Sequence, residues 1–343
     1  MTTDQPTPTG DESVLLFDLA DSGLTAGIKA GLDRVEDVLH TVLDTEVEFV
    51  RNAALHLVDA GGKRVRPLFT LLAAQFGDPK RQDVITAAAA VELVHIATLY
   101  HDDVMDEATM RRGTVSANAR WDNTVAILAG DYLFAHASRL VSDLGTDAAR
   151  IIAETFAELV TGQMRETIGP NPGDDPIEHY LSVIKLKTGS LIATSGRFGG
   201  MCSGAAEEHV TALRQYGQIV GAAFQISDDI IDIASLADES GKTPGTDLRE
   251  GVPTLPMLYA LADHEPGDRD GLRLRELLGR PLTDDDEVAE ALNLLRESSA
   301  LPRARKTLSD YADEAREVLR ALPDNPAREA LRSMADYLVD RTG

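Results

Sequence analysis

Cysteine is almost absent from the sequence, and basic residues are scarce. One cysteine, Cys202, occurs in 343 residues, so neither an internal disulfide nor a thiolate metal cage can form. Lys and Arg number 33 against 57 Asp and Glu, which gives a formal net charge of −24. A chain with this charge repels polyanions, and we therefore expect no nucleic-acid partner.

Long apolar runs are absent as well. No stretch reaches the roughly 18 apolar residues that a membrane-spanning helix needs. The residues from Met1 to Glu12 lack the basic start of a secretion signal. The sequence therefore predicts a protein without a transmembrane segment, located in the cytoplasm. Since 43% of the residues are hydrophobic, the chain is too apolar to be disordered and can bury a sizeable core.

The spacing of apolar residues predicts helices nearly throughout. Ala and Leu are abundant, apolar residues recur every three or four positions, and the alternation typical of strands is rare. We predict a flexible tail over residues 1–13 and a single all-α domain over 14–343. The expected helices, separated by glycine- and proline-containing turns, span 22–59, 64–76, 81–107, 118–144, 147–168, 176–203, 206–235, 253–264, 270–279, 285–297 and 300–341.

Two aspartate clusters share the pattern Asp-Asp-x-x-Asp. One comprises Asp102, Asp103 and Asp106, and the other comprises Asp228, Asp229 and Asp232. In a helix, the first and last aspartates of each cluster share a face. Similar acidic patterns at 174–178 and 286–290 have polar flanks and predict solvated surface. The clusters at 102 and 228 instead end stretches without Lys or Arg, over 84–101 and 215–227.

Carboxylates at the end of a buried helix need a compensating cation. They repel one another and lose hydration, and either a divalent metal or an arginine from another helix could offset this. Carboxylate oxygens suit magnesium, which also keeps waters and takes phosphate oxygens. We therefore expect magnesium, together with a di- or triphosphate, on Asp102, Asp106, Asp228 and Asp232.

Basic residues beside glycines are the expected partners of such an anion. They occur in four groups, at 61–67, 111–113, 185–189 and 241–249. A loop that leads into a helix favours anions through its backbone N–H groups, and Arg or Lys side chains add charge-assisted hydrogen bonds. In so acidic a chain, these groups predict binding sites for phosphate.

Taken in order, these motifs resemble the all-trans isoprenyl (polyprenyl) diphosphate synthase family, from about Gly61 to Pro256. The matching segments are 61–67, 92–95, 102–113, 130–133, 187–189, 224–232 and 241–248. The resemblance implies antiparallel helices around a deep central cavity, usually in a homodimer. It also implies head-to-tail condensation of isopentenyl diphosphate with an allylic diphosphate, which binds with three magnesium ions.

The resemblance also assigns roles to individual residues. Ionisation of the allylic substrate would involve Asp102, Asp103, Asp106, Lys187, Asp228 and Asp229. The allylic diphosphate would contact Arg111, Lys187, Thr188, Gln225 and Lys242. Isopentenyl diphosphate would contact Lys63, Arg66, His95 and Arg112. Where many relatives have a further lysine, this chain has Val252, so either Arg249 or Lys242 compensates or the allylic affinity is lower.

The helix that precedes the first cluster predicts a long product. Its positions facing the growing chain are Val91, Val94, Ala97 and Thr98, and none is bulky enough to close a tunnel. We therefore predict a long-chain polyprenyl diphosphate, about octaprenyl to nonaprenyl, for a quinone side chain, released with peripheral membrane contact. Alternatively, Phe134 or Phe156 on a neighbouring helix sets a geranylgeranyl or farnesyl stop.

Other functional classes remain as alternatives. A terpene cyclase or a head-to-head synthase also ionises an allylic diphosphate, but needs no separate site for isopentenyl diphosphate. A non-catalytic subunit of a heteromeric synthase typically lacks one aspartate cluster, whereas both are present here. A module that only binds magnesium and phosphate would show no turnover.

Overall fold

A computed structural model describes residues 19–235, 244–263 and 269–342, and these residues are almost entirely helical. A small antiparallel hairpin, β1 (Met110–Arg111) with β2 (Thr114–Val115), is the sheet within this part of the chain. The α-helices are α1 (Ser22–Leu43), α2 (Glu48–Asp59), α3 (Val65–Ala73), α4 (Gln82–Met105), α5 (Ala117–Arg120), α6 (Asn123–Asp143), α7 (Thr146–Ile168), α8 (Pro176–Ile184), α9 (Ser190–Ser203), α10 (Glu207–Ala234), α11 (Thr246–Glu250), α12 (Leu255–Ala262), α13 (Arg269–Leu278), α14 (Asp285–Glu297), α15 (Ala300–Val318) and α16 (Pro326–Asp340). The predicted all-α fold is confirmed.

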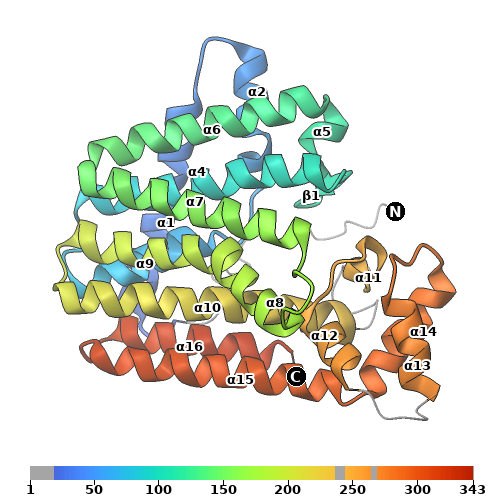
Figure 1. Ribbon diagram of the computed structural model, residues 1–343. Helices are drawn as coiled ribbons and strands as arrows, with labels where there is room; N and C mark the ends of the chain where they lie inside the picture. Colours follow the sequence, from blue (N-terminus) through green and yellow to red (C-terminus); the bar gives the residue numbers. More distant parts are fainter. Residues whose placement is uncertain (1–18, 236–243, 264–268, 343) are drawn as a thin grey trace, which may run out of the picture.

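The long helices lie side by side in a stack, with α11 to α14 grouped at one end (Figure 1). Helix α4 occupies the interior, where it packs against α1, α3, α6 and α9. It is apolar on all sides, as a helix surrounded by others must be. Among the described residues, α4 is the helix long and apolar enough to cross a membrane, but 78% of its most apolar stretch is buried inside the protein. Its hydrophobicity is therefore explained by its place in the core.

Glycines allow the central helices to pack closely. A Cβ atom added at Gly199 of α9 would lie 2.3 Å from the carbonyl oxygen of Thr70 in α3, and one added at Gly217 of α10 would lie 2.7 Å from that of Ile192. No side chain fits at these distances, so α9 contacts both neighbours through backbone. Cys202, near the end of α9, is buried, and burial raises the pKa of its thiol to about 12.

Most predicted helices are confirmed to within two residues, but three were predicted as continuous and are not. The range 22–59 breaks between α1 and α2, and 118–144 breaks where Asp122 accepts a hydrogen bond from the N–H of Val125 and begins α6. The range 300–341 breaks where Asn325 caps α16 and Pro326 occupies its first turn. At the last two breaks an N-cap residue begins a new helix although the apolar spacing continues.

The range 176–203 is helical throughout but changes its winding. Residues Lys185–Gly189 form a π turn, η2, between α8 and α9. Such turns often occur at functional sites because they change the direction of side chains. The short 3₁₀ segments η1 (Ala74–Phe76) and η3 (Leu319–Ala321), the β1–β2 hairpin and α11 were not predicted. The predicted division into a tail over 1–13 and one domain over 14–343 stays a prediction.

Candidate active site

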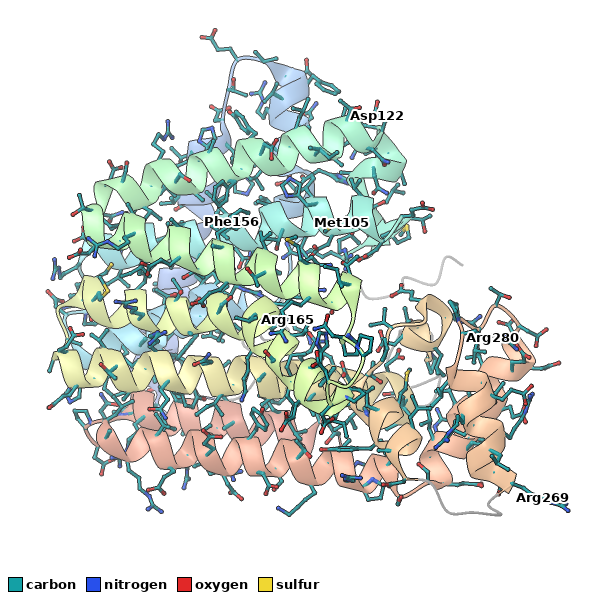
Figure 2. The ribbon with its side chains drawn as sticks, in the orientation of Figure 1. Met105, Asp122, Phe156, Arg165, Arg269 and Arg280 are labelled. Carbon is teal, nitrogen blue, oxygen red and sulfur yellow. The ribbon has the colours of Figure 1, made fainter. Side chains whose placement is uncertain are left out.

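A cavity of about 630 Å³ lies between α3, α4, the hairpin, α7, η2 and α10. Figure 2 shows Met105, at the end of α4, and Arg165, near the end of α7, on the side of the stack that faces α11 and α12. Eleven of the predicted site residues line the cavity, namely Lys63, Arg66, His95, Thr98, Asp102, Arg111, Arg112, Lys187, Thr188, Gln225 and Asp228. The structure therefore brings acidic residues from α4 and α10 and most of the predicted basic residues to one cavity.

The aspartates of the first cluster have different surroundings. Asp102 faces the cavity, and burial raises the pKa of its carboxyl to about 6 although Lys187 partly opposes this. Asp103 is buried and accepts a hydrogen bond from Nε of Arg111 at 2.6 Å, which ties the hairpin to α4. Asp106 ends α4 and is exposed. Asp103 thus positions Arg111, whereas Asp102 faces the space in which a ligand would bind.

In the second cluster, too, one aspartate lines the cavity and the others bind protein groups. Asp228 lines the cavity. Asp229 is buried and accepts hydrogen bonds from the Tyr180 hydroxyl, from Nε2 of Gln225 at 3.1 Å and from the backbone N–H of Leu255. Burial raises its pKa to about 7. Asp232 accepts from the backbone N–H groups of residues 246 and 247 at the start of α11. Asp229 and Asp232 therefore link α10 to α8, α11 and α12.

Arg341, just after α16, contacts the second cluster and was not predicted. Its guanidinium lies 2.9 Å from Oδ1 of Asp228, donates to Oγ of Ser227 at 2.6 Å and lies 4.5 Å from the ring centre of Phe224. No motif marks the region after residue 260, so sequence spacing could not reveal a contact across more than 100 residues.

Glu92 pairs with two arginines of the basic wall of the cavity, which consists of Arg64, Arg66, His95 and Arg112. Its Oε1 accepts from Nη1 of Arg64 at 3.0 Å and lies 3.5 Å from Nη2 of Arg112. Arg64 also pairs with Glu36, and Arg112 donates to the carbonyl oxygen of Leu57 at 2.8 Å. Sequence reasoning did not assign roles to Glu92, Arg64 or Glu36. The two arginines are thus held in place before any ligand binds.

Arg66 and His95 complete this wall. Nε of Arg66 has no hydrogen-bond partner within the described residues, and burial lowers the pKa of Arg66 to about 10. Burial and the charge of Arg66 hold the pKa of His95 well below its usual range, so the imidazole is neutral. The wall has a surplus of positive charge and an unused donor, which suits an anion.

Unusual backbone shapes the loop beside this wall. Arg64 and Arg112 adopt positive φ angles of 44° and 51°, which non-glycine residues rarely do. A Cβ atom at Gly62, whose φ is 139°, would lie 2.9 Å from Cζ of Arg112. Glycine at position 62 therefore leaves the space that the Arg112 guanidinium occupies.

The π turn presents Lys187 and Thr188 to the cavity. Nζ of Lys187 pairs with Oε2 of Glu166 on α7, and the hydroxyl of Thr188 donates to Oε1 of Gln225 at 3.4 Å. Glu166 was not predicted because its role depends on how α7 crosses η2. Lys242, the other predicted lysine, lies outside the described residues.

The surroundings of Val252 differ from those expected for a phosphate site. A second cavity of about 170 Å³ has Tyr180, Asp229, Asp247 and Val252 in its wall, together with Lys187. Burial raises the pKa of Asp247 to about 8, and nearby acids add to the effect. Nη2 of Arg249 donates to Asp285 of α14 at 2.7 Å, so the proposed compensation by Arg249 would require it to leave this partner.

The donor set fits divalent metal when a diphosphate completes it. Within the described ranges, no three His, Cys, Asp or Glu side chains are close enough to hold an ion alone. The predicted ligands Asp102, Asp106, Asp228 and Asp232 instead lie on two helices, α4 and α10. Burial raises the pKa values of Asp102, Asp229 and Asp247, so their ionised forms are disfavoured without a nearby cation. A metal ion bound to carboxylate and phosphate oxygens would supply that charge.

Thr98, Leu159 and Ile192 also line the cavity. The other predicted tunnel residues, Val91, Val94 and Ala97, do not line it and are buried further along α4. The alternative stop, Phe134 with Phe156, forms a ring pair between α6 and α7 with centroids 4.2 Å apart.

Comparison with known proteins identifies the family. The family described as Polyprenyl synthetase matches residues 47–295. A nonaprenyl diphosphate synthase of Mycobacterium tuberculosis is 58% identical over 95% of this chain and 97% of its own, and a dimethylallyltranstransferase of the same organism is 50% identical over 94% and 97%. The crystal structure of geranylgeranyl pyrophosphate synthase from Corynebacterium glutamicum, complexed with calcium and isoprenyl diphosphate, superposes with a TM-score of 0.85 at 53% identity, over 95% of this chain and 99% of that one. The predicted family and enzyme class are confirmed, and the chain belongs to the polyprenyl synthetase family of prenyltransferases.

Proposed function

We propose that the protein condenses isopentenyl diphosphate head-to-tail with an allylic diphosphate and repeats the step to make a long-chain polyprenyl diphosphate. The observation that supports this most directly is the division of one cavity into two walls. The acids Asp102 and Asp228 suit a metal-bound diphosphate, whereas Arg66, His95 and Arg112 suit a diphosphate without metal.

On the allylic side, the residues hold the leaving diphosphate. Asp102, Asp106, Asp228 and Asp232 would hold magnesium, three ions in all, which neutralises charge on the leaving group when bound. Lys187 and Arg111 add positive charge near the breaking C–O bond, and Thr188 and Gln225 can donate hydrogen bonds there. Lys242, outside the described residues, would be a further cation.

On the other side, Arg66 and Arg112 would bind isopentenyl diphosphate and orient its double bond, with neutral His95 as a hydrogen-bond partner. Lys63, which is exposed, would approach from the opening. C4 of isopentenyl diphosphate then bonds to C1 of the allylic group as the C–O bond breaks. The C2 proton passes to the departed diphosphate, so no side chain needs to act as base.

Small residues along α4 support a long product. Thr98 lines the cavity, Val94 and Val91 continue its line along α4, and Ala97 lies on the flank of that line. The 58% identical relative is named a nonaprenyl diphosphate synthase. The 53% identical structure, a geranylgeranyl pyrophosphate synthase, favours the shorter alternative instead, with Phe134 and Phe156 as the stop.

We also propose a homodimer that acts in the cytoplasm and supplies quinone side chains, with peripheral membrane contact during product release. Supporting the dimer, large apolar side chains are exposed on α6 and α7, namely Ile127, Leu128, Val160, Met164 and Ile168. Exposed apolar patches of this kind mark interfaces or membrane contacts.

The product distribution tests the proposed function. Purified protein is incubated with magnesium, labelled isopentenyl diphosphate and, separately, geranyl, farnesyl and geranylgeranyl diphosphate. We expect products longer than geranylgeranyl. A stop at geranylgeranyl or shorter would favour the Phe134–Phe156 alternative. No turnover with any primer would instead favour a non-catalytic subunit.

A further inference from the structure

Lys187, a proposed ligand of the allylic diphosphate, is already paired with a carboxylate. Its Nζ contacts Oε2 of Glu166, and the two side chains are 31% and 32% exposed. Both residues line the cavity of about 170 Å³, and Lys187 lines the cavity of about 630 Å³ as well. An anion that uses Lys187 must therefore compete with Glu166 for the ammonium group.

The backbone fixes this pair in place. A Cβ atom at Gly162 of α7 would lie 2.5 Å from the backbone nitrogen of Lys187, so α7 and the π turn touch there. Gly162 and Glu166 are four residues apart and share a face of α7. The contact at Gly162 therefore places the Glu166 carboxylate beside the Lys187 side chain.

Acids near this pair oppose a free anion, although Arg66, Arg111 and Arg112 line the larger cavity as well. Asp102 and Asp228 line the larger cavity, and Asp229 and Asp247 line the smaller one. Val252, which also lines the smaller cavity, is apolar. A diphosphate without metal would meet these carboxylates and a lysine whose charge Glu166 already neutralises. A metal-loaded diphosphate would bring cations to these carboxylates, of which Asp228 already pairs with Arg341.

We propose that Glu166 is a specificity-determining residue that keeps metal-free diphosphates, including isopentenyl diphosphate, out of the allylic position. The Glu166 carboxylate pairs with Lys187 until a metal-loaded diphosphate binds. Lys187 then leaves Glu166 and pairs with phosphate oxygens of the diphosphate. The inference rests on the proposed function and extends it: the two similar substrates are sorted by whether each brings metal.

The test compares Glu166→Gln, which keeps the shape but removes the charge, with Glu158→Gln. Glu158 is an exposed acid on the same helix, two turns earlier, so its variant changes net charge equally. Calorimetry measures inorganic pyrophosphate binding in the presence of a metal chelator. The site at Arg66 and Arg112 should bind pyrophosphate equally in all variants, so the change concerns the second, weaker site at Lys187. We expect about fivefold tighter binding for Glu166→Gln, the magnitude of a partly exposed ion pair, and no change for Glu158→Gln. Equal effects of both variants would overturn the proposal.

Steady-state kinetics provides the second measurement. At high isopentenyl diphosphate, Glu166→Gln should show substrate inhibition at about fivefold lower concentration than wild type. Glu166→Asp keeps the negative charge but moves it away from Lys187. In this variant, inhibition should set in at a concentration between those of wild type and Glu166→Gln. Unchanged inhibition in an active, folded Glu166→Gln enzyme would overturn the inference. Pyrophosphate binding without product formation by wild type would contradict the proposed function instead.

Discussion

Glu92 shows how one buried acid can prepare a cationic wall for a ligand. It is 1% exposed, yet it contacts Arg64 and Arg112, and its charge also reaches Arg66. Ordering flexible arginines in advance lowers the entropy lost when a diphosphate binds. The excess of arginines over acids leaves the wall positive.

Glu92→Gln should therefore destabilise the fold. Removing one partner of a buried ion pair leaves the other charge uncompensated, and we expect a loss of about 3 kcal/mol in the free energy of unfolding. The matched control is Glu36→Gln, which loses a partner of the same Arg64 but at a half-exposed position. It should lose less than about 1 kcal/mol. Urea unfolding measures both, and equal losses would contradict the role of burial.

Asp102 and Asp229 predict how the stability of the protein depends on pH. Burial raises their pKa values to about 6 and about 7, above the ordinary value near 3.9. The folded protein thus retains protons that the unfolded chain has lost, so without metal its stability falls as pH rises from about 4 to 7.

Of the two, Asp102 is a proposed metal ligand. Metal binds its ionised form, so the effect of metal should run the other way. We expect magnesium with pyrophosphate to raise Tm more at about pH 8 than at about pH 6. Thermal unfolding with and without both ligands measures this. An increase that does not change over this range would show that Asp102 does not titrate with metal binding.

At the scale of elements, the crossing of α7 with the π turn positions the Lys187 side chain. Gly162→Ala would place Cβ 2.5 Å from the nitrogen of Lys187 and 2.9 Å from Cβ of Leu186. The helices would have to separate, and we expect a loss of about 2 kcal/mol in stability and a lower kcat.

Gly27→Ala is the control for this substitution. Gly27 also lies inside a helix, α1, but has no atom within 4 Å of its added Cβ. Alanine should be neutral or slightly stabilising there. Denaturation and initial rates measure both variants. A fully stable, active Gly162→Ala enzyme would disprove the positional role of this crossing.

The elements also show what sequence could and could not predict. Asp102 and Asp228 stand out because each ends a stretch without basic residues, and both line the cavity. Glu166 and Arg341 reach the site only through the packing of α7 and α16, and no local pattern records such packing. Helix breaks at Asp122 and Asn325 were missed because caps interrupt an otherwise continuous apolar spacing.

At the scale of the whole molecule, the exposed apolar side chains of α6 and α7 predict association. Leu128 of α6 is 60% exposed, so Leu128→Arg should disrupt a homodimer formed through this face. Leu272→Arg is the control, since Leu272 is 52% exposed on α13, a different part of the molecule. Sedimentation velocity should show a monomer for the first variant and a dimer for the second. A dimer in both would place the interface elsewhere.

The rate at which Cys202 is alkylated should measure how often the helix stack opens locally. Alkylating reagents attack the thiolate, and a pKa of about 12 with 8% exposure keeps this thiol unreactive while α9 is packed. Because the sequence has no other cysteine, each alkylation event would report the opening of this one helix. The wild-type protein thus contains its own probe of local unfolding, and ligands that tighten the stack should slow its labelling.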